Sequence, residues 1–355
     1  MSALFRPDKA ETFKHQALIT PFPEALVGQW IENKPNSEVY SLDNKVLVKR
    51  LSDLSDKEIT WLFNQEQESV IINIGAQRPL VDRILKLQGI KPFTIVTSNL
   101  RQNETARLTL QHVLFPSLQE YVRRNGVFSE GEALQKRLVF GMLEGDETQL
   151  LTLLRKEKIG IKNRSEELAL RINKPKEIEK ICCFLAHKAT QTVLFSQAGQ
   201  WSEIDNETAQ RYILLLEQIR YVYRLESFHS NLKHEFKKGN RIVFSDNGLL
   251  NAHLQNFNSI ENRMDIDSLW KNWLMSERIK RDLNSGLTNE YFFWQAHYGQ
   301  GIDFIVKHSN ESYEAFIFNW NSSKKHSPPP LFKKYYPHIP IKVINTNNYL
   351  SFLIE

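Results

Sequence analysis

The sequence has little of several features that would narrow its function at once. Of its 355 residues only two are cysteines, the adjacent Cys182 and Cys183, and neither belongs to a CxxC or Cys/His ligand spacing. Neighbouring cysteines rarely bridge each other. We therefore predict two reduced thiols on a helix and no metal site built on cysteine.

Long apolar runs and a strong charge are missing as well. No run approaches the ~18 apolar residues of a membrane-spanning helix, and the N-terminal MSALFRPDKAETFKHQ has charges where a signal peptide has an apolar core. We expect a cytoplasmic protein with no membrane partner. The formal net charge of +5 neither demands nor excludes nucleic acid, so local clusters of charge must decide.

A phosphate-binding loop is also missing. The stretch ALITPFPEALVGQW (17–30) lies after a strand-like run and before a helical one, where such a loop would lie. Pro21 and Pro23 have no N–H to donate to a phosphate, and Val27-Gly28 stands where a Lys-Ser/Thr pair would follow. On residues alone, this segment is a strand, a loop and a helix without assigned chemistry.

The patterns that are present predict an α/β fold class with several domains. In residues 1–115 the short runs QALIT, EVYSL, ITWLFN and FTIVTSN alternate with helical segments such as RPLVDRILKLQGI, which indicates a mainly parallel sheet. Residues 116–175 are predicted to form a helical connector. A chain of this length suits two or three domains.

Residues 176–245 have the order of a winged helix-turn-helix module. Helices are predicted at 176–189, 195–200 and 206–219, with Asp205 or Asn206 as the cap of the last, followed by the strand-like runs YVYRLESF and RIVFSD. In residues 246–355 a helix at 268–283 precedes strands at 290–295, 301–307, 313–320 and 341–345. This last part is predicted to be a mixed α/β or α+β domain.

Two places resemble catalytic sites that lack their charges. ITWLFNQEQE is predicted as a strand that ends in the amides Asn64 and Gln65, which have no charge for Mg²⁺. The predicted hairpin 301–321 has one acid, Asp303, while Ile317 and Asn319 lie two apart on one face of its second strand. Phosphodiester cleavage needs several carboxylates around a hard cation. Even with Glu277 from the preceding helix, two carboxylates make a poor magnesium site.

Basic residues gather in the predicted wing. FHSNLKHEFKKGNRIVF (228–244) includes Lys233, Lys237, Lys238 and Arg241, which predicts contacts with phosphates of nucleic acid. A solvated hairpin in a protein-binding module explains the same residues equally well. A second basic patch, with the same two interpretations, is formed by Lys324, Lys325, Lys333 and Lys334, interleaved with Tyr335 and Tyr336.

Taken together, these segments resemble a bacterial and archaeal family of AAA-type ATPases. That family has a middle winged helix and a C-terminal domain of unknown function with a restriction-endonuclease-like fold. The likeness covers nearly the whole chain and rests on the order of several motifs. SDNGLLNAHL is similar to the family's Asp-x-Gly-Leu-Arg-Asn segment, and YEAFIFNWNSSKK to its Glu-x-Lys-Trp-Asn-x-Lys-Lys ending.

The resemblance implies domains at 1–115 (degenerate ATPase-like), 116–175 (helical lid or connector), 176–245 (winged helix) and 246–355 (nuclease-like). It also implies that both catalytic sites have lost their charged groups, since this chain departs from the family at each of them. These relic positions are Val27 in the phosphate loop, Asn64 and Gln65 in place of Asp-Glu, and Asp303, Glu277, Ile317 and Asn319 in the nuclease-like domain.

We therefore predict a catalytically inactive ATPase-like protein that serves as a structural or regulatory binding subunit, with neither ATP nor Mg²⁺ as cofactor. The resemblance implies a protein partner, either a second copy or an active homologous ATPase, with Arg107 at the interface and nucleic acid as a further partner. Two alternatives stay open. One is an ATP- or metal-dependent enzyme acting on nucleic acid, and the other is a DNA-binding regulator that works through its winged helix.

Overall fold

The chain divides into two compact units, Met1–Val113 and Leu114–Glu355. The computed structural model describes residues 15–19, 37–42, 44–72, 77–97, 108–112, 116–127, 130–168, 175–228, 239–296, 299–322 and 327–354. Helices and two sheets, one of them parallel, confirm the predicted α/β class.

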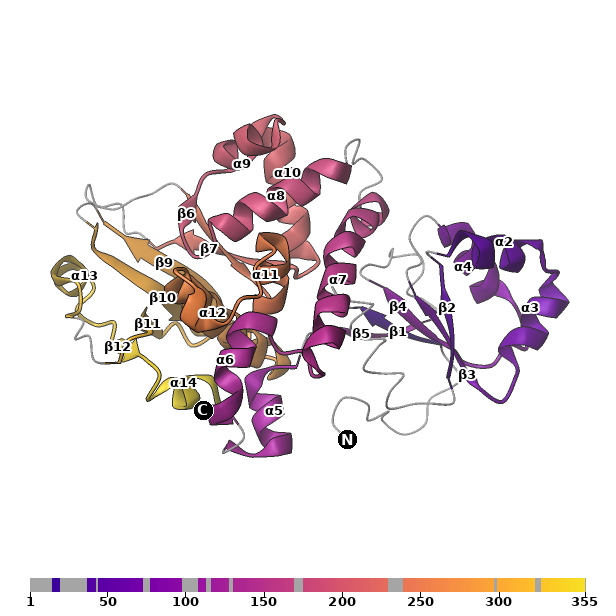
Figure 1. The fold of residues 1–355 in the computed structure, drawn as a ribbon, viewed down its shortest axis with the longest axis horizontal. Coiled ribbons are helices and arrows are strands. Elements are labelled where there is room, and N and C mark those ends of the chain that lie inside the picture. Colours follow the sequence, from indigo (N-terminus) through magenta and orange to yellow (C-terminus); the bar gives the residue numbers. More distant parts are fainter. Residues whose placement is uncertain are drawn as a thin grey trace. The chain divides into compact units, whose positions relative to one another are not determined.

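The first unit is built on a five-stranded parallel sheet (Figure 1). Its strands are β1 (His15–Ile19), β2 (Ser37–Ser41), β3 (Glu68–Ile72), β4 (Thr94–Thr97) and β5 (Leu108–His112). They lie in the order β2-β3-β4-β1-β5, and each neighbouring pair is parallel. All five strands therefore end at one edge of the sheet, where open α/β sheets bind ligands.

The described helices of this unit are α2 (Lys45–Asp53), α3 (Asp56–Phe63) and α4 (Arg78–Lys86). The strand predicted at ITWLFN is wrong, since these residues belong to α3 and its end. Ser55 starts the helix with a capping box, in which its backbone N–H donates to Glu58 Oε2 at 2.7 Å. Ile59 and Phe63, four residues apart, then pack into the core. The cap and this spacing outweigh the strand-like composition.

The second unit begins with helices α5 (Leu118–Asn125), α6 (Glu130–Phe140) and α7 (Glu147–Leu168). The next elements are α8 (Pro175–His187), β6 (Thr192–Val193), α9 (Phe195–Ser202), α10 (Asn206–Gln218), β7 (Val222–Ser227) and β8 (Asn240–Phe244). Strand β8 pairs antiparallel with both β6 and β7, which is the order and pairing of a winged helix-turn-helix. Asp205 caps α10 by accepting a hydrogen bond from Thr208 N at 2.8 Å.

The remaining helices are α11 (Asn247–Leu254), the 3-10 turn Ile260–Asn262, α12 (Ile266–Asn284), α13 (Pro330–Tyr335) and α14 (Tyr349–Ile354). The remaining strands are β9 (Glu290–Gln295), β10 (Gly301–Lys307), β11 (Tyr313–Phe318) and β12 (Ile341–Ile344). The helix predicted at 268–283 and the four strands predicted after it are confirmed within a few residues.

One seven-stranded sheet runs through this unit in the order β12-β11-β10-β9-β7-β8-β6. Strand β7 pairs parallel with β9, so the strands of the predicted winged helix continue directly into the C-terminal strands. The expected domain limit at 245/246 falls between β8 and α11, and the strands on its two sides belong to this one sheet. As a result, residues of β8 and of β10 can line the same cavity.

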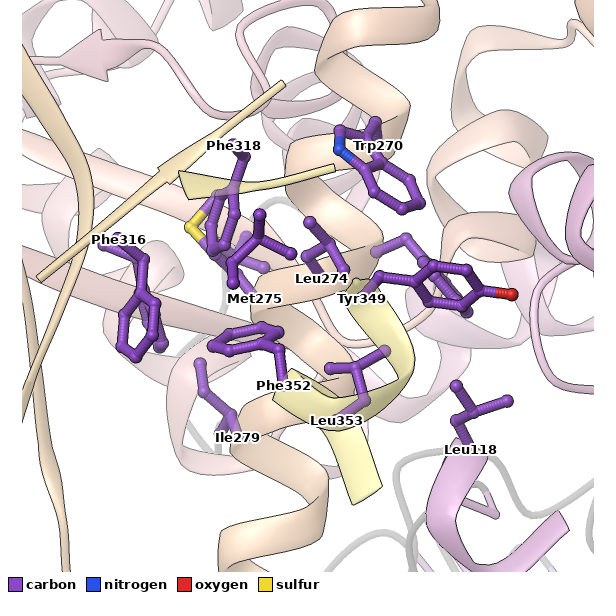
Figure 2. Packing of buried hydrophobic residues seen from close by; sticks show 14 of the residues in the cluster. Leu118, Trp270, Leu274, Met275, Ile279, Phe316, Phe318, Tyr349, Phe352 and Leu353 are labelled. Carbon is purple, nitrogen blue, oxygen red and sulfur yellow. The ribbon is translucent and has the colours of Figure 1, made fainter. Parts of the chain in front are cut away.

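The main core of the second unit lies between α12, β11 and α14 (Figure 2). Trp270 and Leu274 of α12 are fully buried, and the rings of Phe316 and Phe352 lie 4.7 Å apart. Burying a side chain of this size stabilises the fold by about 1.5–3 kcal/mol. This apolar framework fixes α12 against the strands that carry the predicted nuclease-like hairpin.

Candidate functional site

A cavity of about 600 Å³ lies at the hairpin of β10 and β11. Residues from the start of α12, from β8, from the turn between β9 and β10, and from the end of β11 line it. The predicted site residues Asp303, Ile317 and Asn319 all belong to this lining. The structure therefore brings these three together, as the sequence predicted.

Asp303 is held from three sides. Its Oδ2 accepts a hydrogen bond from Phe318 N at 2.9 Å, and its Oδ1 lies 3.2 Å from Lys271 Nζ. Its backbone carbonyl accepts a hydrogen bond from Arg241 Nη1 at 2.8 Å. The carboxylate is thus engaged by the protein itself, with an ammonium group as its nearest cation.

Lys271 comes from the first turns of α12 and bridges two acids. Its Nζ also lies 3.1 Å from Asp267 Oδ2, one helical turn earlier. Burial lowers the pKa of Lys271, but the attraction of Asp303 and Asp267 and the hydrogen bonds to both outweigh it, so the pKa is raised. The lysine stays charged and supplies a fixed positive charge next to Asp303.

The other two positions of the hairpin offer no charge. Ile317 is 7% exposed and packs with the apolar residues of this sheet face. Asn319 Nδ2 donates to the carbonyl of Asn321 at 2.7 Å. Among the residues that the structure describes, no three His, Cys, Asp or Glu side chains come together in a way that could hold a metal ion. The lining therefore does not fit a hard divalent cation, which takes several oxygen ligands.

Glu277 does not join this site, and the expectation that it approaches Asp303 is wrong. It is 1% exposed, pairs with Lys280 and accepts a hydrogen bond from Leu118 N at 2.7 Å. Six residues along an α-helix shift a side chain by about 9 Å and 240° relative to Lys271. Burial raises the pKa of Glu277 despite the opposing effect of Lys280. This glutamate holds the start of α5.

Arg241 also lies elsewhere than expected. It is 8% exposed on β8, with its guanidinium carbon 4.5 Å from the centre of the Phe293 ring, and it lines the cavity. Burial lowers its pKa, and Asp303 opposes that shift. The prediction that Arg241 contacts nucleic acid from an exposed wing is therefore wrong in its placement. Lys233, Lys237 and Lys238 of the wing lie outside the described residues.

Asn64 and Gln65 form no part of a site at the carboxyl edge of the first sheet. They follow α3 and precede β3, so they lie at the opposite end of that strand from the ligand-binding edge. Asn64 accepts a hydrogen bond from Lys91 N at 2.7 Å and donates to the carbonyl of Gly89 at 2.8 Å. Their assignment as relic magnesium-side acids is wrong. Val27 and Arg107 lie outside the described residues.

The segment SDNGLLN (245–251) joins α11 to the end of α6 through buried hydrogen bonds. The sequence did not predict this role. Asp246 Oδ1 accepts from Gly248 N at 2.7 Å, and Oδ2 accepts from Met142 N at 2.8 Å. Asn251 donates to the carbonyl of Val139 at 2.7 Å and so caps the end of α6. The signal was the run of small and amide residues, which are rarely buried without partners.

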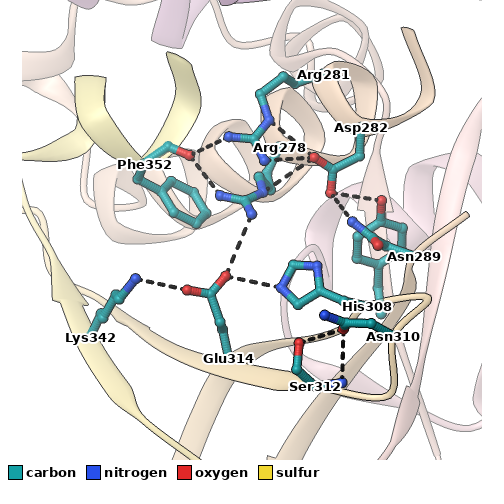
Figure 3. A network of polar contacts seen from close by, with 11 residues as sticks. Arg278, Arg281, Asp282, Asn289, His308, Asn310, Ser312, Glu314, Lys342 and Phe352 are labelled. Atoms are coloured by element: carbon teal, nitrogen blue, oxygen red, sulfur yellow. Dashed lines mark hydrogen bonds and ion pairs between the residues drawn. The ribbon is translucent and has the colours of Figure 1, made fainter. Parts of the chain in front are cut away.

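A second polar cluster, centred on Asp282 of α12, holds elements of the fold together and forms no ligand site (Figure 3). Asp282 is fully buried, and its Oδ1 accepts a hydrogen bond from Arg281 Nη2 at 2.7 Å. Its Oδ2 accepts from Asn289 Nδ2 at 2.9 Å and from Tyr291 Oη at 3.1 Å. Arg278 extends the cluster toward β11. These contacts tie α12 to the sheet and leave Asp282 without spare acceptors for a ligand.

The described part of the predicted winged helix is not strongly basic. Along its outer face α10 carries Glu207, Gln210, Arg211 and Leu214, so one acid balances one base. Arg224 of β7 forms ion pairs with Glu217 and Glu226. This face differs from the basic surface that a nucleic-acid-reading helix offers.

Comparison with known proteins adds one match by sequence. Residues 165–260 match a family model described as Domain of unknown function (DUF8612), which spans the elements from α8 to α11. No curated protein sequence matches the chain. Among the described helices, none is both long and apolar enough to cross a bilayer.

A distant likeness to a solved structure was also found. That structure is of a Signal Transduction ATPase with Numerous Domains (STAND) protein with a tetratricopeptide repeat sensor, from Pyrococcus horikoshii. The match has 12% identity and a TM-score of 0.23, and it covers 77% of this chain and 43% of that one. The chain therefore spans less than half of that protein.

Proposed function

We propose that this protein is a catalytically inactive binding subunit whose nuclease-like site is closed by its own lysine. The observation that carries the proposal is the 3.2 Å contact between Lys271 Nζ and Asp303 Oδ1 inside the cavity. An ammonium ion compensates the charge of a carboxylate as a metal would. It has no vacant coordination position, so it cannot activate water or polarise a phosphoryl oxygen.

The remaining positions support the same conclusion. Ile317 and Asn319 face the cavity where further carboxylates and a cation would be needed, and Glu277 is committed to α5. The strands and the long helix around the cavity are nevertheless fully packed. A preserved scaffold with an internally neutralised site suits binding better than turnover.

For the first unit, we propose a role in assembly with a second copy or with an active homologous ATPase in the cytoplasm. The proposal rests on the likeness of the sequence to AAA-type ATPases and on the lack of a loop lysine near Val27. The exposed indole of Trp61 on α3, with 68% of its surface accessible, supports a protein partner, because tryptophan is enriched at the centres of interfaces. We propose that ATP and Mg²⁺ are not cofactors.

A cleavage assay tests the central part of this proposal. The purified chain is incubated with plasmid, linear duplex and single-stranded DNA in the presence of Mg²⁺ or Mn²⁺. We expect no more product than from the Asp303→Ala variant. Metal-dependent cleavage that the variant lacks would show an active nuclease instead. Titration with Mg·ATP tests the first unit, where micromolar binding with turnover would contradict our assignment of residues 17–30.

A second candidate is a DNA-binding regulator that uses the winged helix. It is favoured by the order of α8, β6, α9, α10, β7 and β8, and opposed by the balanced charges on α10. Retention on DNA at low salt that is lost when Lys237 and Lys238 are changed to Glu would support it. Unchanged retention in this variant, or no retention of the parent chain, would remove it.

A further inference from the structure

The cavity beside Lys271 has a surplus of hydrogen-bond donors. Gln295 Oε1 accepts from Thr192 Oγ1 at 2.8 Å, and Gln300 Oε1 accepts from Leu331 N at 3.2 Å. Both oxygens are therefore used within the protein, whereas neither amide NH₂ group donates to a described residue. A lining of this kind favours a ligand that is rich in acceptors.

Arg241 adds to the surplus of hydrogen-bond donors in the cavity. Only its Nη1 donates to the protein, to the carbonyl of Asp303, so Nε and Nη2 have no partner among the described residues. The residue is 8% exposed, and it belongs to the lining of the cavity. Buried polar groups without partners are rare in folded proteins. Nε is closed to solvent, so a bound anion next to the guanidinium would provide an acceptor for Nη2.

The charges and the size of the cavity narrow the ligand further. Four charged side chains belong to its lining, Lys271 and Arg241 against Asp303 and Asp267, and Asp267 is the more exposed acid, with 61% of its side chain accessible. The volume of about 600 Å³ suits a ligand larger than a single phosphate ion. The partly exposed indole of Trp320 offers an aromatic surface in the same cavity.

We propose that this cavity binds one nucleotide unit without cleaving it, with the phosphate at Lys271 and Arg241 and the base against Trp320. This inference rests on the proposed function, in which Lys271 takes the place of a metal ion. The acidic rim at Asp267 opposes a polyanion. A free nucleoside monophosphate therefore fits better than the middle of a strand.

Calorimetric titration of the full chain with uridine 5′-monophosphate, inorganic phosphate and uridine tests this inference. Two variants should change the affinity for the monophosphate in opposite directions. Lys271→Gln removes a charged donor, and we expect binding at least about tenfold weaker. Asp267→Asn removes a negative charge from an exposed position, and we expect binding about threefold tighter. Trp320→Leu should reduce the affinity to that of inorganic phosphate.

Lys342→Gln provides the matched control, because this lysine pairs with Glu314 away from the cavity. A monophosphate that binds equally to all variants, or not at all at millimolar concentration, would overturn the inference. A 5′-phosphorylated oligonucleotide that competes better than the monophosphate would identify a strand end as the source of the nucleotide. Metal-dependent cleavage would overturn the proposed function itself, whereas absent binding without cleavage removes only this inference.

Discussion

The ion pair between Lys271 and Asp303 permits a quantitative prediction. At 3.2 Å and an effective dielectric constant of about 20, the gross attraction between the two charges is about 5 kcal/mol. Most of it is offset by the cost of desolvating both groups, since their side chains are only 23% and 17% exposed. We expect a net coupling energy of about 1–2 kcal/mol.

A double-mutant cycle with Lys271→Met and Asp303→Asn measures this coupling from the free energy of unfolding in urea. Tryptophan fluorescence follows the second unit, since Trp270 and Trp273 are fully buried there. The raised pKa of Lys271 fixes the sign of the pH dependence. The coupling is present below about pH 10.4, where lysine of the unfolded chain is charged, and it is lost as pH rises through the folded-state pKa. A coupling energy below about 0.3 kcal/mol at pH 7 would show that the pair is not formed.

Three further predictions concern the framework around the site. A Cβ atom at Gly248 would lie 2.3 Å from the carbonyl oxygen of Phe140. Gly248→Ala should therefore lower the unfolding free energy by about 2–4 kcal/mol. An unchanged urea midpoint would contradict the close approach of α11 to α6. Burial lowers the pKa of His253 to about 3. From pH 8 to pH 5 the unfolded chain gains a proton that the folded chain does not, which removes about 2 kcal/mol, and His253→Gln should lose that much less over the same range. Asp282→Asn leaves the guanidinium of Arg281 without its carboxylate, and we expect a loss of about 3 kcal/mol in urea unfolding, whereas a loss below 1 kcal/mol would indicate water inside the cluster.

The alternation of apolar residues predicted the C-terminal elements well. The strands at 290–295 and 301–307 and the helix at 268–283 have long, regular patterns that tertiary contacts reinforce. The strand at ITWLFN failed because its composition favours both structures and the deciding signal lies before it. Ser55 followed by Glu58 three residues later is a capping box, and it predicts a helix start.

The candidate site was predictable only in part. Strand pairing alone places Asp303 beside Ile317 and Asn319, and the two-residue period of the second strand puts those two on one face. The hydrogen-bond partners of Glu277 and Arg241, in contrast, come from segments far away in the sequence. Glu277 binds Leu118 N, 159 residues away, and Arg241 reaches Asp303 across 62 residues. No local pattern encodes such distances.

The proposal that this site is inactive is tested most directly by giving it the carboxylates that it lacks. The doubly substituted chain Lys271→Glu, Ile317→Glu places two carboxylates beside Asp303 in place of the internal cation and an apolar side chain. Titration with Mn²⁺, followed by electron paramagnetic resonance, should show no site in the parent chain that depends on Asp303. The substituted chain should gain one site, which a further Asp303→Ala substitution removes. A Mn²⁺ site in the parent chain that Asp303→Ala abolishes would contradict the central claim.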